Sequence, residues 1–98
     1  MHLTNHASER IKERVGIPKR SQLAVIDRAF AEGIKHSETK GSLHRYLDRL
    51  YLQERTANNL RVYNYNVYLF RDDVLITVIP LNQKHYSACD KFKRKKGN

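Results

Sequence analysis

Basic and imidazole side chains near the start of the chain have a spacing that could serve phosphate chemistry. In the stretch TNHASERIKERVGIPKR (residues 4–20), His6, Arg10 and Arg14 lie four residues apart. On a helix this spacing forms one stripe, beside a second stripe that is apolar. Cleavage of RNA without a metal needs a base, an acid and cations that hold the phosphate as charge builds up. We therefore predict His6 as a catalytic residue, and Arg10 and Arg14 as phosphate contacts.

A second set of such side chains lies in the segment RVYNYNVYLFR. Arg61, Tyr63 and Tyr65 alternate there, so on one strand they would share a side. We predict Arg61 and Tyr63 as further catalytic residues. Aromatic rings interleaved with basic residues also suit single-stranded RNA, where bases stack on the rings. Each set also has an ordinary structural explanation, because tyrosines pack on half-buried sheets and arginines extend into water.

The net charge is the strongest bulk feature of the chain. A charge of +9 on 98 residues predicts attraction to polyanions. Residues 1–59 balance to +4, residues 60–80 to zero and residues 81–98 to +5, so the C-terminal segment is electrostatically distinct. This segment contributes Lys84, His85 and Tyr86 as further candidates for the chemistry. Its cations are predicted to bind nucleic acid: Lys91, Lys93, Arg94, Lys95 and Lys96.

The elements that must position these residues follow from the hydrophobic period. Apolar residues recur at helical spacing over the first half of the chain, and the period changes to two after residue 59. The predicted helices span residues 4–16, 21–33 and 42–54, and the predicted strands 60–65, 66–70 and 74–79. This order predicts an α+β domain over 1–83, with three N-terminal helices on one face of a three-stranded antiparallel meander. A fourth strand is left open, and residues 84–98 are predicted to form a flexible basic tail.

Several classes of protein and site are disfavoured by the sequence. It has no glycine-rich phosphate loop and no Cys/His cluster with zinc spacing. His2 and His6 have helical metal-ligand spacing, but no third ligand suggests itself, so we expect no metal and no cofactor. The lone Cys89 favours a reducing cytosol. No apolar run is long enough to span a membrane.

Residues 4–20 and the segment TANNLRVYNYNVYLFRDDVLITVIPL (residues 56–81) resemble the opening and the final meander of short proteins from bacterial and phage mobile elements. More distantly, the chain is similar to RelE-like and BrnT-like toxins. The resemblance implies helices before an antiparallel sheet and cleavage of RNA without a metal. It implies His6 as general acid or base, with Arg10, Arg14 and Arg61 on the phosphate and Tyr63 nearby. Pro80 departs from the pattern, because it interrupts the region where those toxins carry a further strand.

Three functions are consistent with these features. The first is a metal-independent ribonuclease of the toxin type, which requires His and Arg to converge in one concave site. The second is a non-catalytic protein that binds RNA, another nucleic acid or a ribonucleoprotein, such as a phage inhibitor of a host defence complex. The third is an interaction module whose charge is incidental, for example one that binds an acidic protein.

Overall fold

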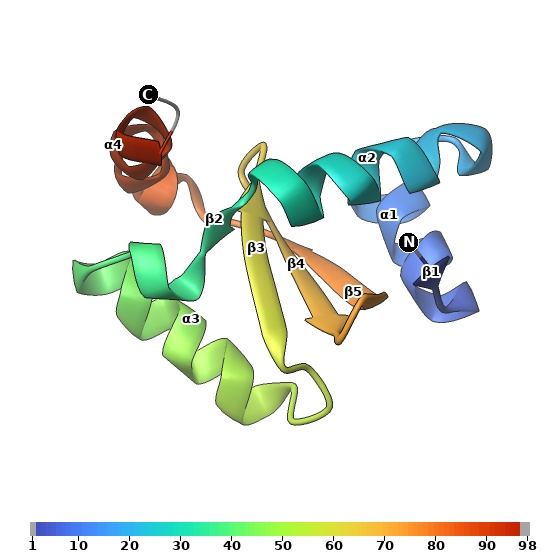
Figure 1. Cartoon of the computed structure of the whole chain (residues 1–98), viewed down its shortest axis with the longest axis horizontal. Helices are drawn as coiled ribbons and strands as arrows, with labels where there is room; N and C mark the ends of the chain where they lie inside the picture. Colours follow the sequence, from blue (N-terminus) through green and yellow to red (C-terminus); the bar gives the residue numbers. More distant parts are fainter. Residues whose placement is uncertain (1, 97–98) are drawn as a thin grey trace.

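A computed structural model describes residues 2–96, with only the backbone for Lys96, and has a sheet between two groups of helices (Figure 1). In chain order the elements are β1 (His2–Leu3), α1 (Asn5–Arg14), α2 (Lys19–Glu32), β2 (Ile34–Lys35), the 3₁₀ turn η1 (His36–Glu38), α3 (Gly41–Gln53), β3 (Asn59–Tyr63), β4 (Asn66–Arg71), β5 (Val74–Pro80), the 3₁₀ turn η2 (Gln83–His85) and α4 (Tyr86–Lys96).

The ends of the first helices follow local chemistry. The Thr4 hydroxyl accepts the Ala7 N–H at 3.0 Å and caps α1. Gly16 follows this helix with a φ of +76°, which glycine adopts without strain. Helix α2 begins at Lys19, directly after Pro18 and two residues before its predicted start at residue 21. The fixed φ of proline suits the start of a helix, which explains the earlier start.

The sheet is mixed and has five strands, in the order β1-β5-β4-β3-β2. β1 runs parallel to β5, whereas β5, β4, β3 and β2 are antiparallel neighbours. The prediction of a three-stranded antiparallel meander is therefore wrong. Both added strands are only two residues long. A strand of that length contains one period of alternation, so its sequence carries no strand pattern.

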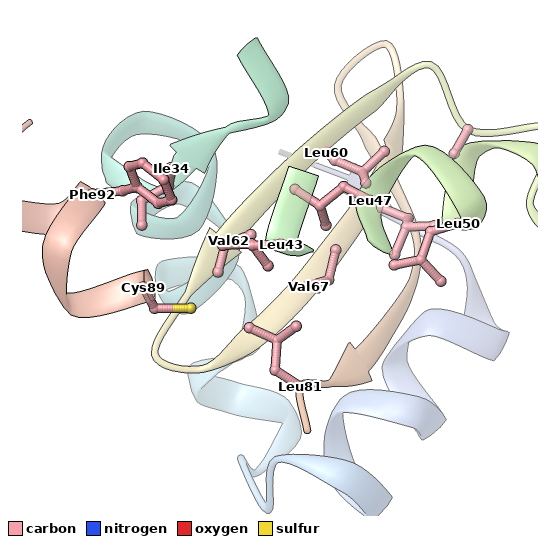
Figure 2. Packing of buried hydrophobic residues seen from close by; sticks show 12 residues of the cluster. Ile34, Leu43, Leu47, Leu50, Leu60, Val62, Val67, Leu81, Cys89 and Phe92 are labelled. Carbon is pink, nitrogen blue, oxygen red and sulfur yellow. The ribbon is translucent and has the colours of Figure 1, made fainter. Parts of the chain in front are cut away.

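The helices cover both faces of the sheet, and this is the second correction to the predicted fold. One core lies between the sheet and α1 and α2, and consists of Ala7, Ile11, Ile26, Ala29, Tyr68, Phe70, Leu75 and Val78. The other lies between the sheet, α3 and α4 (Figure 2), and consists of Ile34, Leu43, Leu47, Leu50, Ala57, Leu60, Val62, Val67, Leu69, Leu81, Cys89 and Phe92. We call these the α1/α2 core and the α3/α4 core.

The central strand β4 shows why the helices cannot all lie on one face. Val67, Tyr68, Leu69 and Phe70 are consecutive and all buried. Val67 and Leu69 belong to the α3/α4 core, while Tyr68 and Phe70 belong to the α1/α2 core. A strand buried on both faces is an unbroken apolar run, and this is why its alternation is weak in the sequence.

Helix α4 is the third correction, because the helices are not all N-terminal. Residues 86–96 form this helix within the segment predicted to be a tail. Its Cys89 and Phe92 are 4% and 8% exposed and belong to the α3/α4 core (Figure 2). His85, just before the helix, is 3% exposed. Three buried side chains at positions 85, 89 and 92 follow one helical face and hold α4 against the domain.

Candidate nucleic-acid interface

The docking of α4 determines which of its cations reach solvent. His85, Cys89 and Phe92 face the core, with Tyr86 and Ala88 partly buried beside them, and the cations of the helix lie outside this contact. Lys91, Lys93 and Lys95 are exposed. Arg94 is exposed as well and has an interaction with another group, while the Lys96 side chain lies outside the described residues. Four of the five predicted binding residues thus project from an ordered helix.

A pair of tyrosines lies on the Lys93 side of α4. The rings of Tyr65 and Tyr86 stack with centroids 4.1 Å apart and planes 20° apart. The Tyr65 hydroxyl donates a 2.6 Å hydrogen bond to Oδ1 of Asp90, and this bond is the main cause of the raised pKa of Tyr65. Asp90 is the one acidic residue among residues 81–98, so the bond engages the carboxylate nearest the lysines. The Tyr65 ring remains 38% exposed.

The backbone at Tyr65 is unusual for an aromatic residue. Asn64 and Tyr65 form the two-residue link between β3 and β4, with φ values of +48° and +62°. Hairpins of this type favour Asn-Gly, because a side chain on the second residue is strained at positive φ. The contacts of Tyr65 with Tyr86 and Asp90 offset that strain. The predicted strand therefore ends at Tyr63, and Tyr65 does not continue its alternation.

A pocket opens between α4, the end of α2 and the β3–β4 turn. Its volume is about 190 Å³, and its lining consists of Glu32, Ile34, Val62, Tyr63, Asn64, Tyr65, Cys89, Asp90 and Lys93. Tyr63, predicted to be catalytic, therefore lies in a pocket wall near Lys93. Cys89 forms part of the floor, and burial raises the pKa of its thiol to about 11. A thiol with this pKa stays protonated near neutral pH and is a poor nucleophile.

His85 lies where α3 meets the segment leading into α4. Its ring stacks on Tyr46 at 5.2 Å, and its buried Nδ1 has no hydrogen-bond partner among residues 2–96. Burial lowers the pKa of His85, and the positive charges of Lys84 and Arg49 lower it further. A neutral imidazole is therefore favoured at neutral pH. Arg49 lies 5.9 Å above the Tyr46 ring, so its charge adds to the basic surface on this side of the molecule.

The stripe on α1 is only partly a surface feature. Arg10 donates to the Nε2 of His6 at 3.2 Å and contacts Glu13 at 3.4 Å. Arg14 instead donates to the carbonyl of Val78 on β5 at 2.8 Å. This bond fastens α1 to the sheet and occupies one donor of the arginine that was predicted to bind phosphate.

Arg61 is a buried residue that joins two elements. Its Nε donates to the carbonyl of Phe30 at 3.0 Å, and its Nη1 donates to Asn59 and Leu60 at 2.8 and 2.9 Å. Its guanidinium also lies 4.7 Å above the Phe30 ring. Burial lowers the pKa of Arg61, while the negative charge available on Tyr51 and Glu38 opposes that shift. Gly33 makes the close approach possible, since a Cβ there would lie 2.8 Å from the Cβ of Arg61.

Direct contacts do not assemble the predicted catalytic residues. Helix α1 packs against β5, whereas Arg61 and Tyr63 lie on β3, two strands away. Within residues 2–96, no hydrogen bond or ion pair joins His6 to Arg61 or Tyr63. Tyr46 and Arg49 lie near His85, and neither was predicted as a site residue. Their spacing on α3 is an ordinary helical one, so only the packing of the helix against η2 reveals the cluster.

Comparisons of the chain with family models, curated proteins and solved structures found no match. The resemblance to mobile-element proteins and RelE-like or BrnT-like toxins therefore stays a prediction. Among the described helices, none is long and apolar enough to cross a membrane.

Proposed function

We propose that this protein binds single-stranded nucleic acid, RNA in particular, through α4 and the β3–β4 turn. The observation that carries the proposal is an ordered helix with three exposed lysines, Lys91, Lys93 and Lys95, of which Lys93 lines the same pocket as Tyr65, the stacking partner of Tyr86. Lys91 and Lys95 lie on one side of the helix and Lys93 on the other, so the lysines would hold phosphates along both sides of α4, and the exposed Tyr65 would stack on a base. This combination is common to sequence-tolerant binders of single strands.

Binding without cleavage fits the contacts better than catalysis does. Three of the five donors of Arg61 are directed to two backbone carbonyls and an amide oxygen, and the residue is only 7% exposed, so it is poorly placed to hold a scissile phosphate. His6 has its hydrogen bond with Arg10 on a different part of the domain. A ribonuclease of the toxin type needs these groups around one phosphate. The non-catalytic alternative, which includes binding to a ribonucleoprotein, is therefore our preferred function.

We also place this activity in the cytosol. Cys89 is buried and unpaired, which suits a reducing compartment where structural thiols stay reduced. The same lysines would attract an acidic protein, which would then compete with RNA for α4.

The salt dependence of RNA binding tests the role of α4. The variant Lys91→Ala/Lys93→Ala/Lys95→Ala should flatten the plot of log affinity against log salt by about 2 units. The reason is that each phosphate contact on a single strand contributes about 0.7. A fluorescein-labelled single-stranded RNA, titrated by anisotropy at several salt concentrations, measures the slope.

The matched control removes the same charge elsewhere. Lys12, Lys19 and Arg20 are exposed on α1 and α2, and replacing all three with alanine lowers the net charge equally. This control should keep most of the original slope. Equal slopes for the two triple variants would show that net charge alone attracts RNA and that α4 is not the site.

The stacking role of Tyr65 is separable from charge. Tyr65→Asn keeps a residue that tolerates positive φ while removing the ring. It should weaken RNA binding by about 1–3 kcal/mol without changing the salt slope, as loss of one base–aromatic stack does.

The same RNA incubated with the unmutated protein in EDTA gives the catalytic test. Cleavage that disappears in His6→Ala would replace the binding proposal with the ribonuclease hypothesis.

A further inference from the structure

Three potential metal ligands meet where η1 precedes α3, away from the α4 interface. His44 and Asp48 lie one turn apart on α3, and His36 is the first residue of η1. The Nε2 of His36 lies 2.6 Å from Oδ1 of Asp48, and the Nε2 of His44 lies 3.7 Å from the same oxygen. All three candidate ligand atoms lie within 4.8 Å of one another.

The hydrogen bonds of Thr39 fix the tautomer of His44. The Thr39 hydroxyl donates its proton to the carbonyl of His36 at 2.7 Å. Its oxygen lies 3.0 Å from Nδ1 of His44 and must accept there, so Nδ1 carries the hydrogen. In a neutral imidazole the lone pair is then on Nε2, which faces the Asp48 carboxylate. A lone pair and a carboxylate oxygen that face each other repel unless a proton or a metal ion lies between them.

The ring positions are set by packing before any ligand arrives. The imidazoles of His36 and His44 stack with centroids 4.2 Å apart and planes 21° apart. The Tyr51 ring packs edge-on against His36 at 5.2 Å. Thr39 is 3% exposed, so its bond to His44 is shielded from water. The bond between Nδ1 of His44 and Thr39 is of the kind that orients a histidine and holds its free nitrogen toward a metal. The two stacked rings must turn to bring both lone pairs onto one ion, because imidazole binds a metal in the plane of its ring.

We propose that His36, His44 and Asp48 bind a divalent first-row transition metal of the Zn²⁺ class. Zn²⁺ takes imidazole nitrogen and carboxylate oxygen at about 2.0–2.2 Å, which places its ligands about 3.4 Å apart in a tetrahedron. The His44–Asp48 separation is close to that value, and the His36–Asp48 pair needs to open by less than 1 Å. The Asp48 side chain is 50% exposed, which leaves the fourth position accessible to water.

The metal would replace the proton that now joins His36 to Asp48. The short His36–Asp48 contact requires a hydrogen between the two atoms. A metal takes both lone pairs instead, so that hydrogen must leave Nε2, either for Nδ1 of the same ring or for solvent.

Calorimetric titration of the full chain with Zn²⁺ at pH 7.5 tests the site. We expect one Zn²⁺ per chain, and no binding in the same concentration range for His44→Ala or Asp48→Asn. Thr39→Val keeps all three ligands and should weaken binding by about 10–100-fold, as the loss of a partner behind a ligand does. His2→Ala is the matched control, because it removes a histidine outside the cluster and should bind Zn²⁺ normally.

Further measurements exclude misfolding and adventitious binding as explanations of the result. Circular dichroism of each variant checks that the fold is intact, and Zn²⁺ should raise the melting temperature of the unmutated chain but not of His44→Ala. Co²⁺ should give the visible absorption bands of a four-coordinate site. No heat and no melting shift with Zn²⁺ would overturn the proposal, as would equal binding by folded His44→Ala and His2→Ala.

Discussion

At the residue scale, similar side chains have different roles because their surroundings differ. Arg61 and Lys93 both lie near the β3–β4 hairpin, yet Arg61 is 7% exposed and directed to carbonyls, while Lys93 reaches solvent. A buried guanidinium without such partners would cost several kcal/mol in desolvation. The hydrogen bonds of Arg61 to Phe30 and Leu60 are therefore what allows it to stay inside.

His85 gives a prediction about acid stability. Its pKa is lowered in the folded chain by burial, with smaller contributions from Lys84 and Arg49. The unfolded chain takes up the proton at the ordinary pKa of 6.5, so below this pH the unfolded state binds more protons than the folded state. Stability should therefore decrease as the pH falls from 6.5 toward the lower folded pKa.

The variant His85→Phe tests this linkage. Phenylalanine keeps an aromatic ring beside Tyr46 and has no proton to gain. Urea unfolding of both proteins between pH 7.5 and 5 should show a smaller loss of stability in the variant. The two proteins share every other ionisable group, so the difference between the two curves isolates His85. Parallel curves would show that His85 does not resist protonation in the folded state.

At the element scale, α4 depends on a small number of anchors. Phe92 is the largest of its side chains in the α3/α4 core. Phe92→Ala should lower the free energy of unfolding by about 3 kcal/mol, the lower end for such core truncations because the site is near a helix end. The helix should also become sensitive to trypsin, since its lysines would leave the folded surface more often.

Leu52 supplies the control for this prediction. It is on α3 and is 74% exposed, so Leu52→Ala should change stability by no more than about 0.5 kcal/mol. Chemical unfolding and limited proteolysis of the two variants give the comparison. Similar behaviour of the Phe92 and Leu52 variants would mean that α4 is held loosely and that its lysines are not preorganised.

At the scale of the whole molecule, one sheet separates two cores and couples them. Every residue from Val67 to Phe70 on β4 belongs to one core or the other, so neither core can open without disturbing this strand. Leu47 and Ile26 are both fully buried, on opposite sides of the sheet. Leu47→Ala and Ile26→Ala should each lower the free energy of unfolding by about 2–5 kcal/mol.

Both variants should still unfold in a single transition. Far-UV circular dichroism reports on the helices, and tyrosine fluorescence reports on side-chain packing. The midpoints from the two probes should coincide for each variant, as they do when a small domain unfolds in a two-state manner. Separate midpoints in Leu47→Ala but not in Ile26→Ala would show that the α3/α4 core can melt by itself.

Local chemistry was sufficient to predict the longer elements from the sequence. Leu43, Leu47 and Leu50 follow the helical period so clearly that their helix and its buried face could both be predicted, and all three are buried. The change to a period of two located β3, β4 and β5. Asp72, between β4 and β5, has a φ of +55°, a turn conformation that aspartate tolerates better than most residues. The excess of positive charge at the C-terminal end is likewise a property of composition.

Only the tertiary structure shows how these elements pack and which side chains the packing brings together. β1 and β2 are too short for a periodic pattern, and α4 has few apolar residues, so each is defined by what it packs against. Arg61 was predicted to bind phosphate, but it donates to the carbonyl of Phe30, 31 residues earlier. The residues next to Arg61 in the sequence give no sign of that contact. His36 joins His44 and Asp48 only through the path of the chain around η1. Contacts between residues distant in sequence depend on how the helices pack on the two faces of the sheet, and that packing has no local signature.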